Sequence, residues 1–177
     1  MSLMLKLSHA KTVGQFADLV PMSPLENLQF RRELHSILAV DPELQLIFKH
    51  LCLADPTIFF NTCGWTLDPR REPGMRNQPF ILRPKQSQVV RDVNDAIIEQ
   101  HNLVVDKSRD EGATELVTGV FTVHWLLDPD SQFLVGSRKE EYVDRGVTIV
   151  GDTVRGSHKC LFHKICYKVV HAPRWMR

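Results

Sequence analysis

Long apolar runs are missing from this sequence of 177 residues. The first residues, MSLMLKLSHAK, contain too short an apolar run for a signal peptide, and no stretch approaches the ~20 apolar residues of a membrane span. The four cysteines form no C-x-x-C pair, and a reducing, cytoplasmic setting is the simplest interpretation of their pattern. The sequence therefore predicts neither a membrane protein nor a secreted one.

Excess charge of one sign is also missing. The formal net charge is +1, so no overall electrostatic attraction to nucleic acid is expected. The basic residues are clustered instead, with six in residues 70–91 against Glu72 and seven in residues 145–177 against Asp152. Such clusters can mark a surface that faces a polyanion, although a charged run is more often a solvated face. The 43% hydrophobic and 24% charged composition is that of a soluble globular protein.

Signals for helix starts are present throughout the first third of the chain. Ser23-Pro24-Leu25-Glu26 has the pattern of a capping box with proline at the first helical position. Asp41-Pro42 begins a second helix in the same way, and Asp55-Pro56 opens a shorter turn that stops at Gly64. We expect a helical N-terminal region at residues 1–67, a linker rich in proline and charge at 68–79, and a second region at 80–177.

The centre of the sequence, residues 103–137, predicts a strand, a loop, a helix and a second strand. The strands are expected at residues 103–105 and 133–135, and the apolar residues between them recur at helical spacing. A loop between a strand and a helix directs backbone N–H groups and the positive end of the helix dipole to one point. This arrangement suits a phosphate group.

The strict phosphate-binding pattern G-x-x-x-x-G-K-[ST] is not met in this loop. Gly112 and Thr114 fit the pattern, but Asp106 stands at the first glycine and Ala113 stands at the lysine. A phosphate loop of the ordinary kind is therefore not indicated.

Two cations, Lys107 and Arg109, nevertheless lie at the front of the same loop. The segment Lys107-Ser108-Arg109-Asp110-Glu111-Gly112-Ala113-Thr114 resembles the deviant P-loop of tailed-phage terminase large subunits, the ATPases that pump DNA into empty capsids. In this resemblance, the lysine that is missing at Ala113 is relocated to Lys107.

Further segments resemble the same family. Arg83-Pro84-Lys85-Gln86 is similar to its R-x-x-Q adenine motif, in which a glutamine amide donates to and accepts from the adenine edge. Residues 136–144, GSRKEEYVD, are similar to a G-S-x-K-x-x-x-V-D segment, and the C-terminus is similar to a helix that ends in P-x-W. The alternative interpretations are structural, namely an exposed Gln86 in a first helical turn and an ordinary helix N-terminus at residues 136–144.

The resemblance covers residues 55–177 and implies an α/β fold, a partial P-loop NTPase whose parallel sheet is flanked by helices, preceded by a short all-helical N-terminal region. It implies ATP and Mg²⁺ as cofactors, with Thr114 holding the magnesium ion of the bound nucleotide. The residues implied to bind nucleotide are Lys107, Ser108, Arg109, Gly112, Ala113 and Thr114 at the phosphates, Gln86 at adenine, and Ser137, Arg138 and Lys139 as contacts that couple nucleotide to DNA.

The resemblance also implies a biological setting in a phage or prophage. The complete motor is an ATPase and nuclease that packages double-stranded DNA into the capsid. Its partners are the terminase small subunit and the portal protein, and it can form a homo-oligomeric ring. The implied location is the cytoplasm of the infected bacterial host, without membrane association.

Groups required for hydrolysis are not found in the sequence. This chemistry needs a magnesium-binding Asp after another apolar strand, usually with a neighbouring Glu that polarises the attacking water. The one candidate, Asp152 after residues 147–150, lacks that Glu and is interpreted as a turn residue. The nuclease cluster of terminases is absent too. We expect a truncated fragment or a relative without catalysis, which binds nucleotide weakly.

Two other functions stay open at this point. The first is a non-catalytic module that binds DNA or a packaging partner through its basic stretches, favoured by the carboxylates Asp106, Asp110 and Glu111 beside the phosphate loop. The second is a helicase-like ATPase fragment. The histidines and cysteines of residues 158–166 would crowd along one helix, so buried thiols and surface imidazoles are favoured over a zinc site.

Overall fold

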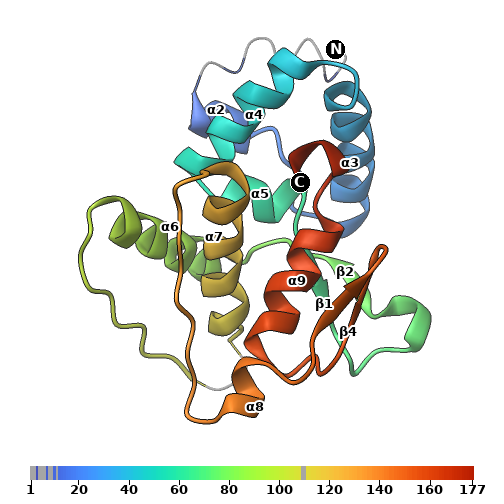
Figure 1. Cartoon of the computed structure of the whole chain (residues 1–177). Helices are drawn as coiled ribbons and strands as arrows, with labels where there is room; N and C mark the ends of the chain where they lie inside the picture. Colours follow the sequence, from blue (N-terminus) through green and yellow to red (C-terminus); the bar gives the residue numbers. More distant parts are fainter. Residues whose placement is uncertain (1–2, 4–6, 8–9, 11, 109–110) are drawn as a thin grey trace. The chain divides into compact units, whose positions relative to one another are not determined.

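The computed structural model (Figure 1) describes residues 3, 7, 10, 12–108 and 111–177. The chain divides into two compact units. Unit 1 comprises Met1–Leu82 and Pro173–Arg177, and unit 2 comprises Arg83–Ala172. Arg109, which was expected in the phosphate loop, lies outside the described residues. In the part of the chain that is described, no helix combines the length and the apolar character needed to cross a membrane.

Unit 1 consists of helices and one short pair of strands. Its elements are α2 (Val13–Ala17), α3 (Pro24–Leu38), α4 (Pro42–Ala54), α5 (Thr57–Thr62), β1 (Trp65–Leu67), the 3-10 helix η1 (Pro73–Met75), β2 (Asn77–Pro79) and the 3-10 helix η2 (Arg174–Met176). Strands β1 and β2 are antiparallel, with Trp65 opposite Pro79. The three helices expected after Ser23, Asp41 and Asp55 are thereby confirmed.

A buried arginine joins α3 to the end of α5 in unit 1. The Arg31 guanidinium donates to the carbonyl oxygens of Phe60 at 2.9 Å and Gly64 at 2.7 Å, and its Nε donates to Asn27 Oδ1 at 2.6 Å. The last carbonyl groups of a helix have no partner within it, so these bonds satisfy α5 from outside. Phe60 itself is buried.

Unit 2 is built around a central helix. Its elements are α6 (Pro84–Ile98), α7 (Ala113–Leu127), α8 (Glu140–Val143), β3 (Thr148–Val150), β4 (Thr153–Arg155) and α9 (Leu161–His171). Helix α7 packs against both α6 and α9, and it contributes the buried side chains Leu116, Val120 and Val123 (Figure 1). The helix expected between residues 105 and 133 is confirmed as α7, and the expected C-terminal helix is confirmed as α9.

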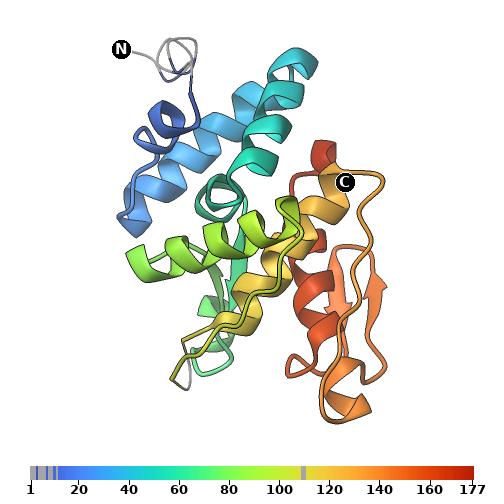
Figure 2. The ribbon, with the colours of Figure 1, turned by 90° about the vertical axis from the view of Figure 1, so that its left-hand side faces the viewer.

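The expected parallel sheet is wrong. Among the described residues, the strands form antiparallel pairs, β1 with β2 and β3 with β4, so this is not a P-loop core. Residues 103–105 and 133–135 are unpaired and belong to the long irregular connections on either end of α7 (Figure 2). A strand requires a second backbone for its N–H and C=O groups, and neither run has one among the described residues. Although both runs are apolar, Val104 is 90% and Leu134 is 98% exposed.

Candidate functional site

The start of helix α7 presents backbone N–H groups at the end of the loop. Gly112 lies directly before the helix with φ at +79°, a left-handed conformation that glycine adopts without strain. The first helical hydrogen bond runs from Leu116 N to Gly112 O at 3.1 Å. The N–H groups of residues 113–115 make no hydrogen bond to another described residue, and such a helix end favours an anion.

These N–H groups border a hollow of about 370 Å³, which we call the α7 hollow. Its floor is the first two turns of α7, and its sides are the two extended connections that lie on either side of the helix in sequence. The residues that line it are Val105, Ala113, Thr114, Val117, Thr118, Phe121, Leu134, Val135, Gly136 and Leu161. The predicted loop and both predicted strand positions therefore meet at one place, although no sheet joins them.

Gln86, the expected adenine-binding residue, lies beside this loop. Its Nε2 donates to the carbonyl oxygen of Glu111 at 3.3 Å and lies 3.6 Å from the position that a Cβ would occupy on Gly112. Its Oε1 accepts from Arg83 N at 3.1 Å, which caps the start of α6. Each polar atom of the amide thus makes one bond within the protein, which leaves its second N–H and the second lone pair of its oxygen for contact with adenine.

The carboxylates at the start of α7 are paired with cations. Glu111 accepts from Arg83 Nη2 at 3.2 Å, and the Glu115 carboxylate is bound by the amino groups of both Lys164 and Lys168. Burial alone would raise the pKa of Glu115, but the two lysines, Lys168 foremost, lower it to about 2. The sequence predicts that Glu111 repels a bound anion, and the pairing of Glu111 with Arg83 reduces this repulsion.

The paired lysines were missed by reasoning from the sequence. Lys164 and Lys168 are four residues apart in a predicted helix, so a shared face was foreseeable. Their position against Glu115 was not, because the contact spans 49 and 53 residues. The cost of burial lowers the pKa of Lys168, which also donates to Thr118 Oγ1 at 3.4 Å.

Six of the predicted site residues are exposed, namely Lys107, Ser108, Thr114, Ser137, Arg138 and Lys139. Lys107, Ser108 and Thr114 have exposed side chains near the hollow, and Ser137 follows Gly136 at its edge. The next two residues make local contacts, with the Arg138 guanidinium 5.5 Å from the Tyr142 ring and Lys139 Nζ 4.0 Å from Glu141. The structure thus places Gln86 against Gly112, Thr114 in the wall of the hollow, and Ser137 next to the lining residue Gly136.

The arrangement suits binding of an anion rather than acid–base chemistry. Helix N–H groups that have no partner among the described residues, together with nearby cations, fit a phosphate group, and the exposed Thr114 hydroxyl is available to a magnesium ion carried by a nucleotide. Within residues 12–108 and 111–177, no group of three or more His, Cys, Asp and Glu side chains is placed to hold a metal ion directly. The chain matches no protein-family model, no curated protein and no solved structure.

Proposed function

We propose that the chain is the N-terminal portion of a phage or prophage terminase large subunit and that it binds a nucleoside triphosphate at the α7 hollow. The observation that supports this most directly is the position of Gln86 beside Gly112. Gln86, in the segment that resembles an adenine motif, and Gly112, in the segment that resembles a phosphate motif, are 26 residues apart in the sequence and meet at one helix N-terminus. This contact does not depend on a parallel sheet.

Phosphate binding in this proposal uses groups that the chain itself supplies. The N–H groups of Ala113 and Thr114 and the dipole of α7 stabilise the phosphate oxygens, and Lys107 adds a mobile positive charge. A magnesium ion that arrives with the nucleotide neutralises further phosphate charge when bound. The Thr114 hydroxyl is the group of this chain that would contact that ion.

The proposed setting follows from the same family. In a complete motor, this portion would act with the terminase small subunit and the portal protein on double-stranded DNA, as part of a ring in the cytoplasm of the bacterial host. Hydrolysis of ATP and cleavage of DNA would require groups that this sequence does not contain, so binding is the property to measure.

Calorimetric titration with ATP and magnesium tests the phosphate part of the proposal. We expect saturable one-to-one binding that Lys107→Ala and Thr114→Ala weaken. Lys85→Ala is the matched control, because Lys85 is exposed on α6 and does not line the hollow. The absence of saturable binding by the unaltered chain, or an equal loss in the Lys85 variant, would overturn nucleotide binding at this site.

Comparison of ATP with inorganic tripolyphosphate tests the adenine part. Lys107→Ala removes a contact to phosphate and should weaken the binding of ATP and of tripolyphosphate alike. Gln86→Ala should weaken ATP and leave tripolyphosphate unchanged, because Gln86 is assigned to the base. A common loss of both ligands in Gln86→Ala would assign Gln86 a structural role as the cap of α6 and would remove the adenine assignment.

The terminase part of the proposal is tested at the gene. A tailed phage or prophage commonly encodes the proteins of packaging together, so the flanking reading frames should include a portal protein and a terminase small subunit. Binding of the purified chain to that portal protein should then be measurable by surface plasmon resonance. A chromosomal context without phage genes would contradict this assignment while leaving nucleotide binding unaffected.

A second candidate function, DNA binding without nucleotide, is favoured by the cations around the β3–β4 hairpin. Arg145, Arg155 and Lys159 are exposed and make no ion pair with another described residue, unlike Lys164 and Lys168. Binding to double-stranded DNA should weaken steeply with salt and fall further in Arg145→Gln/Arg155→Gln. If DNA binding persists without any nucleotide binding, this second function replaces the first.

A further inference from the structure

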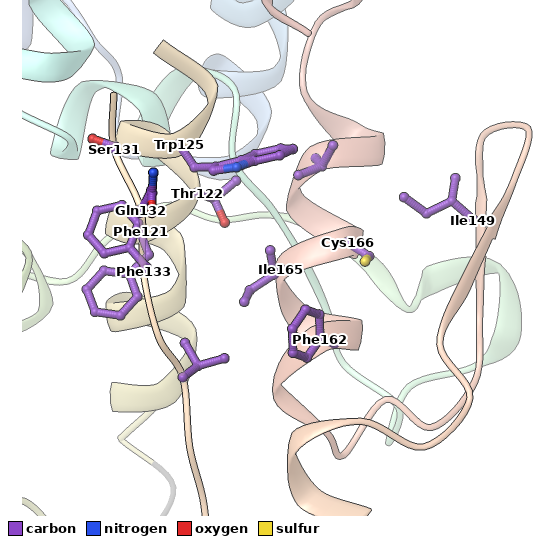
Figure 3. A pocket seen from close by; sticks show the side chains of 12 residues that line it. Phe121, Thr122, Trp125, Ser131, Gln132, Phe133, Ile149, Phe162, Ile165 and Cys166 are labelled. Carbon is purple, nitrogen blue, oxygen red and sulfur yellow. The ribbon is translucent and has the colours of Figure 1, made fainter. Parts of the chain in front are cut away.

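A second cavity in unit 2, distinct in its chemistry from the α7 hollow, lies between α7 and α9 (Figure 3). It has a volume of about 440 Å³, and its remaining walls are the extended run around Phe133 and the Ile149 side chain of β3. We call it the α7–α9 pocket. A volume of this size lies within the roughly 300–1,000 Å³ that is usual for small-molecule sites.

The walls of the α7–α9 pocket are largely aromatic. Phe121 and Phe133 stack with ring centroids 4.4 Å apart and an interplanar angle of 10°, which makes one flat wall. Trp125 reaches across from α7, and Phe162 projects from α9 (Figure 3). Trp125 is 56% exposed and Phe162 is 41% exposed, so apolar ring surface stays in contact with water. A flat ligand that covers these rings would remove that surface from water.

The polar groups of the pocket limit the charge of its ligand. None of the described residues that line it is Asp, Glu, Lys or Arg. The Thr122 hydroxyl donates to Thr118 O at 2.7 Å, and the Ser131 hydroxyl donates to Asp128 Oδ2 at 2.6 Å, so both are already engaged. The Gln132 side chain makes no hydrogen bond to another described residue. An ionised ligand would lose its hydration here without gaining a counter-charge.

We propose that the α7–α9 pocket binds a neutral, mainly apolar molecule that contains a planar ring system and has one polar group within reach of the Gln132 amide. This ligand is not a nucleotide, because the site offers no cation to phosphates. The proposal is independent of nucleotide binding at the α7 hollow and can hold or fail separately.

Cys166 provides a reporter inside this pocket. It lies in the wall formed by α9 and is partly accessible, whereas Cys52, Cys63 and Cys160 are 0%, 2% and 0% exposed. Burial raises the pKa of the Cys166 thiol, so its alkylation is best followed in mildly alkaline buffer. Mass spectrometry of the folded chain after N-ethylmaleimide treatment should find the label at Cys166 first.

The test uses the neutral fluorescent probe N-phenylnaphthylamine and the full chain. We expect one saturable site by probe fluorescence. At a probe concentration about ten times its Kd, mass action leaves about one tenth of the pockets free, so alkylation of Cys166 should slow about tenfold. Anilinonaphthalene sulfonate, which adds a negative charge to similar rings, should bind more weakly.

Val169→Phe fills the pocket and leaves Cys166 in place as reporter, while Ile98→Phe adds the same ring to an exposed position on α6 as control. We expect the first variant to lose probe binding and the second to keep it, with unchanged circular dichroism in both. The proposal is overturned if the probe does not saturate, if Val169→Phe binds it equally, or if the probe leaves Cys166 alkylation unchanged. It is also overturned if raising the protein concentration alone protects Cys166, because a second copy then occupies the pocket.

Discussion

Gly64 lies against the backbone of Phe60 without room for a side chain. A Cβ at this position would lie 2.8 Å from the Phe60 carbonyl oxygen and 2.9 Å from its Cα, and backbone atoms cannot rotate away. We expect Gly64→Ala to lower the free energy of unfolding by about 1–3 kcal/mol, the usual cost of overpacking. Urea denaturation followed by circular dichroism measures the change.

Gly74 provides the matched control for this substitution. A Cβ on Gly74 would have nothing within 4 Å, so Gly74→Ala should change the free energy of unfolding by less than about 0.5 kcal/mol. Equal losses in the two variants would show that the contact with Phe60 is not the cause.

His35 makes the stability of unit 1 depend on pH. Burial lowers the pKa of His35 below 6.5, the Thr62 carbonyl opposes this shift, and Arg31 adds to it. The Nδ1 atom of His35 is buried and has no hydrogen-bond partner among the described residues. Because the folded chain favours neutral His35, the unfolded chain binds more protons as the pH falls below 6.5, and stability should decrease there.

Urea denaturation at about pH 7.5 and about pH 5.5 measures this effect. We expect a smaller loss between the two values in His35→Gln than in the unaltered chain, whatever the stability of the variant at either pH. His124 and His163 also have lowered pKa values and remain in the variant, so part of the loss should persist. An unchanged difference between the two pH values would exclude His35 as a contributor.

At the scale of the element, two helices with the same sequence signal begin differently. Asp41 Oδ1 accepts from the N–H groups of Glu43 at 3.1 Å and Leu44 at 3.0 Å at the start of α4. The Ser23 hydroxyl makes no bond to the backbone of α3 and donates to the Glu26 carboxylate instead. Asp41→Ala should therefore cost about 1 kcal/mol of unfolding free energy in thermal or urea denaturation, and Ser23→Ala clearly less. A larger loss for Ser23→Ala would contradict this assignment of the caps.

These helix starts show what could be predicted from the sequence. Proline after Ser23 and Asp41 fixes the first helical φ angle locally, so α3 and α4 begin where the sequence predicts. A strand is different, because its hydrogen bonds come from another part of the chain. Residues 103–105 and 133–135 have the composition of strands, and the partner that a sheet requires is not found among the described residues.

The junction of α7 with α9 depends on charges that are shielded from water. Lys168 is 2% exposed and shares the Glu115 carboxylate with Lys164. Glu115→Gln leaves these lysines without a counter-charge and should lower the free energy of unfolding by about 3–5 kcal/mol. Glu115→Gln/Lys168→Met should recover part of the loss, and urea denaturation of the double-mutant cycle measures the coupling. Additive losses would contradict a direct interaction.

The same junction predicts acid sensitivity. The pKa of Glu115 is lowered from 4.5 to about 2, so its contribution is complete above pH 4.5 and is lost as the pH falls toward 2. This window lies below that of His35, which separates the two effects in one pH series. The sequence contains the three charged residues but does not show that they meet. The i, i+4 spacing within a helix tells which residues share a face, but it does not give the distance between two helices.

At the scale of the whole molecule, the unit to which the C-terminal segment belongs is hard to predict from the sequence. Residues Pro173–Arg177 follow α9 of unit 2 but belong to unit 1, where Trp175 contacts Phe48 with ring centroids 5.9 Å apart. The final segment resembles the P-x-W of terminases, but that motif does not show which residues the tryptophan packs against. The candidate site was partly predictable for the same reason: Gly112 and Thr114 are local to one helix start, whereas the lysines that neutralise Glu115 come from α9.

The exposed, extended connections on either side of α7 predict that the chain associates with itself. Val104 and Leu134 are 90% and 98% exposed, and their neighbouring backbone groups are unpaired among the described residues. Exposed apolar runs with free N–H and C=O groups pair readily with another chain. We expect sedimentation velocity to show association that increases with concentration and that Val104→Lys/Leu134→Lys reduces without loss of stability. Val40→Lys is the control, because Val40 is 82% exposed but follows a helix, and it should leave association unchanged. If all variants associate alike, the extended connections are not the contact.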